Sequence, residues 1–249
     1  MMRRVNAGAM RRLARLLPAI VLVVLPQSGA RAVSTLYWNV DSFDEAAAGR
    51  IDGTSVLHDG SIVLAPGVDR IDLPESQYVW GGVRREDGRL VVAVGTPGVV
   101  YEIDGDRMTT LLADDTADFP AIAMSPSGDV FVGTAPGGDV YRIDKDGESE
   151  LLFTSGQNYV WCLAYSPEHG LLVGTGDDAK VYAVDEDGVG TVIYESTEAS
   201  VSVLFAHEGR VLAGTGADGL LLDITPGEDL RVLRDTGYDE ITGIVVDSD

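Results

Sequence analysis

Residues 171–188, LLVGTGDDAKVYAVDEDG, contain two patterns whose residue types could do chemistry. The Gly-Thr-Gly at 174–176 follows an apolar run as a phosphate-binding loop does, and the D-x-D-G at 185–188 has the form that opens a calcium loop. Phosphate binding needs a helix after the glycines, because the free N–H groups of its first turn hold the anion. The residues from Lys180 onward predict a strand instead, so we expect the glycine segment to be a structural turn.

The D-x-D-G pattern recurs at 144–147. A calcium loop needs about six oxygen ligands, among them a distal bidentate Glu. After the motif at 144–147, Glu150 lies too close in sequence to be that ligand. The motif at 185–188 is followed by Val-Gly-Thr at 189–191 and has no Glu there. Asp-Gly between alternating strands is typical of a hairpin turn. We therefore predict two hairpin turns and no cofactor, and keep an adventitious calcium ion as the alternative.

The three histidines and the single cysteine do not form a recognisable catalytic set. His58, His169 and His207 stand in similar short turns of different repeats, so we expect surface residues rather than a zinc site. Cys162 lies in the apolar run VWCLAY, which predicts a small buried core residue. A G-x-S-x-G nucleophile motif is absent from the sequence. We predict no catalytic residue and no metal ligand.

Two copies of Tyr-Val-Trp, at 78–80 and 159–161, are the most distinctive binding chemistry. Their aromatic faces could form a stacking floor for a ligand, or could simply pack between strands. Acidic residues in neighbouring loops would make the same face negative and suited to a cation, a sugar or a basic peptide, unless they are only a solvated surface. The predicted ligand-binding residues are Tyr78, Trp80, Asp118, Tyr159, Trp161, Asp177, Asp178 and Asp218.

The elements that must position these residues repeat along the chain. Four segments align by eye, and their Gly-Thr pairs begin at Gly95, Gly133, Gly174 and Gly214. A period of about 40 residues without a helical pattern indicates a blade-like β unit.

Each unit divides into four short apolar runs joined by turn-forming residues. In the third unit the runs are 159–166, 171–174, 180–185 and 191–196. Both faces of the third run are largely apolar, which is typical of a strand buried between two neighbouring sheets. One such unit cannot bury both faces alone, so neighbours must pack around a common axis. The sequence predicts an all-β fold, a β-propeller of four-stranded blades.

The unit SGDVFVGTAPGGDVYRID at 127–144 resembles the propeller repeats of periplasmic two-component regulators and, more loosely, YVTN- and WD40-type propellers. The resemblance extends over residues 51–249 and implies the fold without implying one function. The Trp-Asp pair of WD40 repeats is absent, and so are the membrane helix and kinase domain of the regulators.

The predicted domain boundaries follow from the repeats. They are a signal peptide at 1–32, a lead-in at 33–50, a partial blade at 51–73, full blades at 74–116, 117–155, 156–196 and 197–235, and a partial blade at 236–249. About three strands are expected in the first partial blade. The final residues EITGIVVDSD match the first strand of another blade. They would either complete a five-bladed ring with residues 51–73 or belong to a truncated larger propeller.

The amino terminus predicts export. A basic segment containing Arg11-Arg12 precedes an apolar run at 16–25 and the small-residue site GARA at 29–32. This stretch is short of the roughly 20 residues that span a bilayer, so no membrane span is expected in the mature chain. We expect a periplasmic or extracellular protein and leave Sec or twin-arginine export open.

The charge of the chain restricts its partners. The formal net charge is −22, from 18 basic and 40 acidic residues. Six of the basic residues and none of the acidic ones lie in 1–32, which leaves the mature chain at −28. Nucleic acid is a poor partner for such a surface. We expect a protein or a small polar or cationic ligand.

Two functional hypotheses follow. The first is an exported, non-enzymatic propeller that binds a ligand or a protein through its acidic face, as part of a sensory or surface protein. The alternative is a metal-dependent enzyme of the lactonase or lyase type. The alternative predicts that acids from different blades converge on one ion near the axis.

Overall fold

Each repeat folds as an antiparallel meander of four strands. The computed structural model describes residues 53–57, 59, 61–65, 71–73, 78–196 and 199–246. The described strands are β1 (Thr54–Val56), β2 (Ile62–Leu64), β3 (Tyr78–Arg84), β4 (Leu90–Gly95), β5 (Gly98–Asp104), β6 (Arg107–Asp114), β7 (Asp118–Met124), β8 (Val130–Ala135), β9 (Asp139–Ile143), β10 (Ser149–Thr154), β11 (Val160–Ser166), β12 (Gly170–Thr175), β13 (Val181–Val184), β14 (Gly190–Tyr194), β15 (Ser200–His207), β16 (Arg210–Gly216), β17 (Leu220–Asp223) and β18 (Arg231–Asp235). The predicted signal peptide and lead-in lie outside the described residues.

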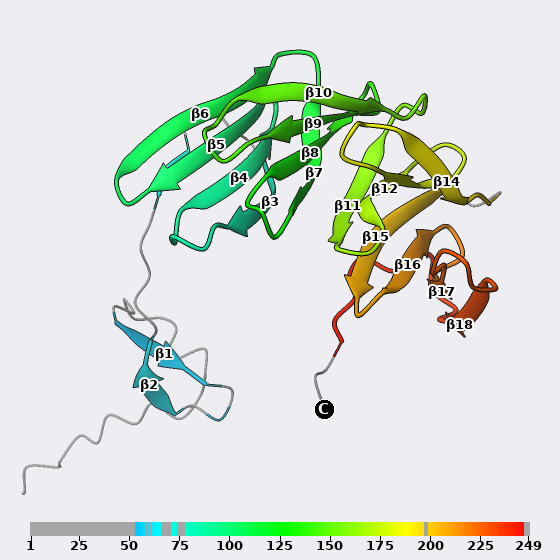
Figure 1. Ribbon diagram of the computed structural model, residues 1–249. Helices are drawn as coiled ribbons and strands as arrows, with labels where there is room; N and C mark the ends of the chain where they lie inside the picture. Colours follow the sequence, from blue (N-terminus) through cyan, green and yellow to red (C-terminus); the bar gives the residue numbers. More distant parts are fainter. Residues whose placement is uncertain are drawn as a thin grey trace, which may run out of the picture. The chain divides into compact units, whose positions relative to one another are not determined.

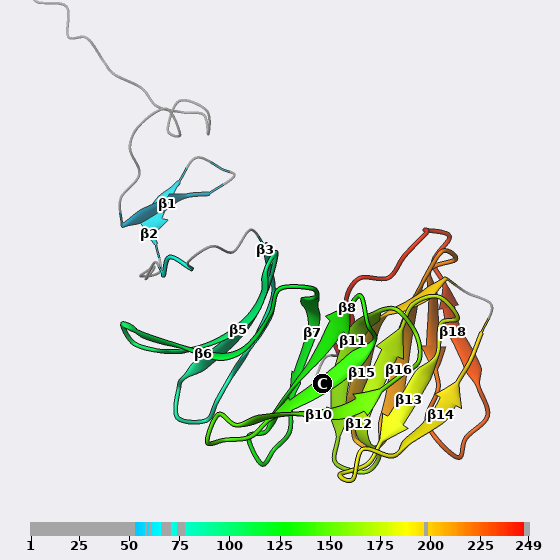
Figure 2. The ribbon, with the colours of Figure 1, turned by 90° about the horizontal axis from the view of Figure 1, so that it is seen from above.

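Four sheets carry the repeats, with strand orders β3 to β6, β7 to β10, β11 to β14 and β15 to β18. We call them blades 1 to 4. Figure 1 shows them in chain order, from the blue-green strand β3 to the red-brown strand β18, and Figure 2 shows the same succession from above. The first strand of each blade packs against the first strand of the next, so β3, β7, β11 and β15 form the inner edge. The predicted β-propeller architecture is confirmed.

The hydrophobic core lies in layers between consecutive blades. Successive side chains of a middle strand point in turn to the preceding and to the following sheet. Both faces of the strand are therefore buried and apolar. Phe119, Ile143 and Val130 are fully buried between blades 1 and 2, and Val160 and Leu171 between blades 2 and 3. Cys162 is buried between blades 3 and 4, as predicted.

The ladders correct the alignment of the first repeat. Ala93 pairs with Val100 across β4 and β5, as Gly133 pairs with Val140 and Gly174 with Val181 in the next two blades. Ala93 is therefore the equivalent of Gly133, and the Gly-Thr pair at Gly95 stands two residues further along than in the other repeats. The Gly-Thr sequence at 95–96 was misleading because Gly95 is needed for a different contact, that with the side chain of Trp80.

The D-x-D-G segments are hairpin turns, as predicted. Asp144 Oδ1 accepts hydrogen bonds from the backbone N–H groups of Asp146 and Glu148, at 2.8 and 2.9 Å. Asp185 Oδ1 accepts in the same way from Asp187 and Val189. Each turn closes on a glycine with positive φ, 91° at 147 and 79° at 188. The first carboxylate of each motif is thus occupied by its own turn.

The two ends of the predicted propeller differ from full blades. In the first unit, residues 1–69, the described strands β1 and β2 form a hairpin, and residues 71–73 of the second unit form no strand. At the other end Glu240 forms an isolated bridge with Gly216, and Ile241 N donates to Thr215 O at 3.2 Å. Gly176 and Ser200 form the same kind of bridge between blades 3 and 4. Residues 240–241 therefore stand where blade 4 would meet a following first strand.

Candidate functional site

Two aromatic pairs occupy equivalent positions in blades 1 and 3, and all of their side chains are exposed except that of Tyr159, which is half-buried. Gly81 pairs with Ala93 as Cys162 pairs with Gly174, so Trp80 and Trp161 precede equivalent residues. Both pairs stand at the beginning of the inner strand of their blade. They therefore lie on the same side of the molecule, the edge at which the inner strands begin. The equivalent pairs in blades 2 and 4 are Asp118 with Pro120 and Ser200 with Ser202.

The aromatic side chains are accessible rather than packed into the core. Tyr78, Trp80 and Trp161 are 57, 45 and 38% exposed. The rings of Tyr159 and Trp161 are stacked, with centroids 5.3 Å apart and planes 14° apart. Those of Tyr78 and Trp80 are tilted by 39° at 6.3 Å. Ring faces at this edge remain available to a ligand.

A carboxylate stands beside the first pair. Asp118 Oδ1 accepts a hydrogen bond from Thr96 N at 2.6 Å, which ties the beginning of β7 to the end of β4. A Cβ built on Gly95 would collide with Trp80 Nε1 and lie 3.0 Å from Asp118 Oδ1. Trp80 and Asp118 therefore converge over Gly95. We call Tyr78, Trp80, Gly95, Thr96 and Asp118 the first aromatic cluster.

The second pair has a similar neighbourhood. Asp177 Oδ2 accepts from Asn158 N at 3.0 Å and from Asn158 Nδ2 at 2.9 Å. Gly176 N donates to Tyr159 O at 3.0 Å. We call Asn158, Tyr159, Trp161, Gly176 and Asp177 the second aromatic cluster. Glycine at 95 and at 176 serves the same purpose, since a Cβ at either position would collide with the indole of the nearby tryptophan.

The other two predicted acids have different surroundings. Asp178 lies 3.5 Å from Lys180 Nζ and accepts from Gln157 Nε2 at 3.4 Å. Lys180 also pairs with Glu195 at 3.1 Å, so the charge of Asp178 is partly offset. Asp218 is exposed in the β16–β17 connection and belongs to neither cluster. Of the eight predicted residues the structure thus groups three around Gly95 and three around Gly176.

The polar partners Thr96, Gln157 and Asn158 were missed by sequence reasoning. A search for charged and aromatic residues overlooks neutral side chains and backbone N–H groups. The sequence did hold a signal for Gln157 and Asn158, since both immediately precede the second Tyr-Val-Trp. Their roles depend on the contact between the β10–β11 and β12–β13 connections. The pairing of β11 with β12 brings these two connections together.

Other acids near this edge have local structural roles. Asp114 Oδ1 accepts from Thr116 Oγ1 and Thr116 N at 2.6 and 2.7 Å, and these hydrogen bonds lower the pKa of that carboxyl. Asp139 Oδ1 accepts from Thr154 Oγ1 at 2.6 Å. In the described part of the chain, no three His, Cys, Asp or Glu side chains form a group that could hold a metal ion. The convergence of acids that the enzyme alternative predicts is not found among these residues.

The histidines do not converge either. His169 Nε2 is 3.0 Å from Gly209 O and joins blade 3 to blade 4. His207 is 3.8 Å from Glu208 and 58% exposed. His58 lies outside the described residues.

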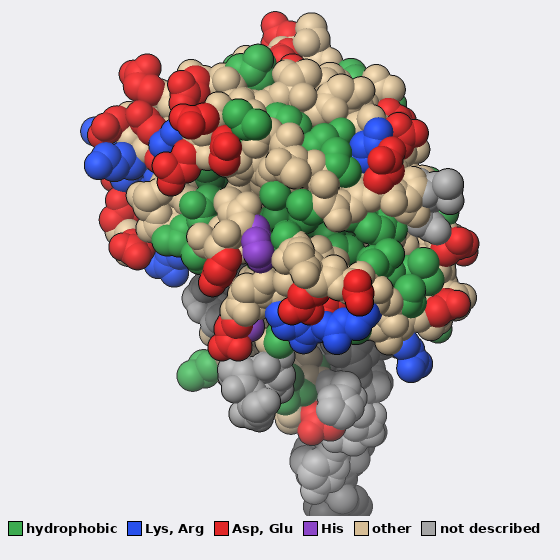
Figure 3. Space-filling view, turned by 45° about the vertical axis from the view of Figure 1, so that its right-hand side comes forward, with side chains coloured by type: hydrophobic (Ala, Val, Ile, Leu, Met, Phe, Trp, Pro, Cys, Tyr) green, Lys and Arg blue, Asp and Glu red, His purple; other side chains and the backbone are tan. Residues whose placement is uncertain are grey.

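In the face shown in Figure 3, Asp and Glu side chains are more widespread than Lys and Arg around hydrophobic stretches.

Comparisons with known proteins support the architecture. Neither a protein-family model nor a curated protein matches the chain by sequence. A virginiamycin B lyase structure from Staphylococcus aureus is similar over 64% of this chain and 56% of its own, with 14% identity and a TM-score of 0.58. A structure from a nidogen–laminin complex matches 68% of each chain, at 15% identity and a TM-score of 0.57.

A third similar structure is the extracellular domain of a hybrid two-component system of B. thetaiotaomicron, with 17% identity and a TM-score of 0.54. The match covers 68% of this chain and 24% of that one. The chain thus spans little more than half of the lyase and about a quarter of that extracellular domain. At these identities the similarity shows the fold alone. By fold, the chain is a β-propeller protein, similar in architecture to proteins that include a lyase and the extracellular domain of a two-component system.

Proposed function

We propose that this chain is an exported, non-enzymatic propeller that binds a basic ligand, such as the lysine- or arginine-rich surface of a protein, through its two aromatic clusters. One observation carries the proposal: Tyr-x-Trp pairs with an exposed tryptophan stand at the same position of blades 1 and 3, and each has a carboxylate beside it. Core packing does not require exposed tryptophan, so this pairing needs another explanation.

Electrostatics favours a cation at these clusters. A ring face attracts an ammonium or guanidinium group by about 0.5–1 kcal/mol at an exposed site, and a nearby carboxylate adds to that attraction. No Lys or Arg among the described residues pairs with Asp118 or Asp177. The net charge of −22 attracts basic partners from a distance and repels nucleic acid.

Export belongs to the proposal as well. The basic and apolar segments before residue 33 support it, and a sensor's extracellular domain shares the fold. No helix in the described part of the chain has the length and apolar character needed to cross a membrane. Cleavage after residue 32, measured by mass spectrometry of the exported protein, tests this part.

The binding experiment uses two peptides of equal length, one rich in lysine and one rich in glutamate. The lysine peptide should bind the full chain, and Trp80→Ala and Trp161→Ala should each weaken it several-fold. Tyr238→Ala is the control, because Tyr238 is 76% exposed and lies outside both clusters. Equal binding of the glutamate peptide, or no effect of either tryptophan substitution, would contradict the proposal. Turnover of lactones or sugars by the purified protein would contradict its non-enzymatic part.

A further inference from the structure

The turns at the opposite ends of the inner strands differ from blade to blade. Arg85 N donates to Arg89 O in the β3–β4 turn, and Ser125 N donates to Asp129 O in the β7–β8 turn. The two turns have the same hydrogen-bond pattern, so Arg85 and Ser125 hold equivalent positions.

Arg85 fills the junction between blades 1 and 2. It is only 5% exposed, and its Nε donates to Glu102 at 3.0 Å. Its terminal nitrogens cross to blade 2, where they donate to Gly128 O and, at 3.4 Å, to Asp144 O. The long side chain thus both occupies the space and satisfies carbonyl groups of the next blade.

His169 performs the corresponding role between blades 3 and 4. Its Nε2 reaches Gly209 O of blade 4 at 3.0 Å. Val130 pairs with Ile143 as Leu171 pairs with Val184, so His169 is the equivalent of Gly128. Blade 2 therefore has a short Ser125 where blade 1 has an arginine, and Gly128 where blade 3 has a histidine.

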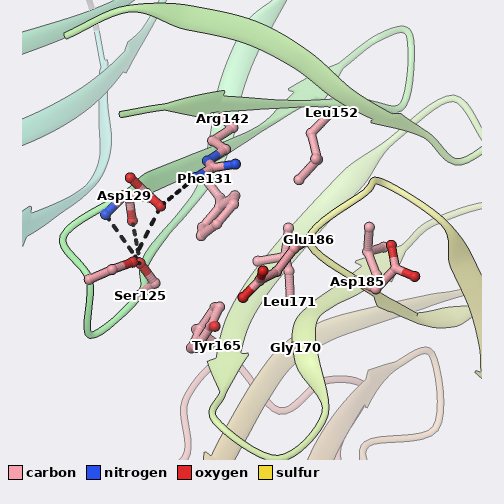
Figure 4. Close-up of a pocket in the computed structure, with 12 residues that line it drawn as sticks. Ser125, Asp129, Phe131, Arg142, Leu152, Tyr165, Gly170, Leu171, Asp185 and Glu186 are labelled. Atoms are coloured by element: carbon pink, nitrogen blue, oxygen red, sulfur yellow. Dashed lines mark hydrogen bonds and ion pairs between the residues drawn. The ribbon is translucent and has the colours of Figure 1, made fainter. Parts of the chain in front are cut away.

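A cavity of about 290 Å³ remains between blades 2 and 3, where neither side chain is long enough to fill the space. Figure 4 shows it bounded by Phe131, Leu152, Tyr165 and Leu171. The rings of Phe131 and Tyr165 lie nearly parallel, 12° apart with centroids at 6.0 Å. Phe131 and Leu171 are nearly buried, at 6 and 2% exposed, and with Leu152 and Tyr165 they give the cavity an apolar side of the kind that binds a ring or a short alkyl chain.

The charge around this cavity is negative. Arg142 contributes one positive charge, but its terminal nitrogen is bound to Asp129 Oδ2 at 2.8 Å. Asp185 accepts hydrogen bonds from its own turn. Glu186 is directed toward the cavity in Figure 4, is exposed, and has no ion pair with any described residue. Glu186 is therefore the charge that a ligand would neutralise.

We propose that the cavity between blades 2 and 3 binds a small amphipathic cation. Its apolar body lies against Phe131 and Tyr165, and its ammonium group lies near Glu186. This site is independent of the two aromatic clusters, which stand at the other end of the inner strands. The opposite preference, a carboxylate bound by Arg142, is the rival to be tested, because Arg142 Nε is buried without a hydrogen-bond partner.

Two probes with the same ring and opposite charge distinguish these possibilities: phenethylamine and phenylacetate. Each is titrated into the full chain, and binding is followed by chemical-shift changes of the protein. We expect saturable binding of the amine and at least tenfold weaker binding of the acid. Phenylacetate binding as tightly as the amine, or a linear response to both probes, would overturn the proposal.

Substitutions locate the binding. Glu186→Gln should weaken the binding of phenethylamine severalfold. Asp187→Asn should have little effect, because it removes the same charge from the same turn but outside the cavity. Ser125→Arg introduces the residue of blade 1 and should abolish binding by filling the space. Trp161→Ala should leave the chemical-shift changes of the cavity residues unchanged, which separates this site from the basic-ligand site. Equal effects of the Glu186 and Asp187 substitutions, or normal binding by a folded Ser125→Arg variant, would contradict the assignment.

Discussion

The indole of Trp161 lies directly over the backbone of Gly176: a Cβ at that glycine would come within 2.6 Å of Trp161 Nε1. Trp80 has the same relationship with Gly95. In blade 2, where Pro120 replaces the tryptophan, the equivalent of Gly176 is Ala135. Blade 4 also has a glycine here, Gly216, although Ser202 replaces the tryptophan, and a Cβ at Gly216 would meet Ser200 Oγ instead. In blades 1 and 3 the glycine leaves the space that the indole occupies.

Gly176→Ala should displace Trp161 without unfolding the protein. The backbone φ at this glycine is not positive, and the indole can rotate away, so we expect a loss of stability of about 1 kcal/mol or less. Tryptophan emission should shift, and lysine-peptide affinity should fall as much as in Trp161→Ala. Gly243→Ala is the matched control, because a Cβ there has no atom within 4 Å. Unchanged emission and affinity would disprove the positioning role.

Gly174→Ala should be far more destabilising, although it lies only two residues away. A Cβ at Gly174 would collide with Cys162 Sγ and lie 3.2 Å from Val201 Cγ1 and Leu204 Cδ1 of blade 4. These atoms are packed in the core, so overpacking should cost about 1–3 kcal/mol. Urea denaturation of both alanine variants measures the contrast. A Gly174→Ala loss no larger than that of Gly176→Ala would contradict it.

Cys162 should be unreactive in the native protein. Burial raises the pKa of its thiol well above the ordinary value, and Sγ is 3.3 Å from Val201 O. A thiolate is the reactive form, so a thiol reagent should label the protein only as it unfolds. The labelling rate should rise in Gly174→Ala. Rapid labelling of the folded wild type would show that the blade 3–4 layer is open.

Asp223 should make stability depend on pH in the acid range. Burial alone would raise the pKa of this 1%-exposed carboxyl, but hydrogen bonds from Thr225 and Arg210 outweigh it and lower the pKa to about 2. A lowered pKa stabilises the fold above the ordinary value of 3.8, and that stability is lost as the pH falls toward 2.

Asp223→Asn should therefore cost about 2 kcal/mol at neutral pH, because hydrogen bonds to a charged group are lost. The difference from wild type should shrink between pH 4 and pH 2. Urea denaturation at several pH values measures it. A constant difference over that range would contradict the predicted linkage.

Much of the fold was accessible from the sequence, because turn residues and alternating apolar runs are local signals. The meander of blade 3 and the hairpin at Asp185 follow from such signals alone. The register of blade 1 did not, since Gly95-Thr96 imitates the repeat while serving Trp80. The site was only partly predictable: Tyr159 and Trp161 are two residues apart in sequence, but Asp118 reaches Trp80 through a contact between blades. The cavity beside Glu186 exists because Ser125 is too short to fill the space equivalent to the one that Arg85 fills between blades 1 and 2. Sequence alone does not show this, since it depends on how the blades pack.

The most direct test of basic-ligand binding is the response of two indole N–H resonances, those of Trp80 and Trp161, assigned with Trp→Phe variants. The account predicts that a lysine-rich peptide shifts both resonances saturably and with one dissociation constant, and that the glutamate-rich peptide shifts neither. If both resonances stay in place while the lysine peptide binds, the ligand lies elsewhere and the central claim is wrong.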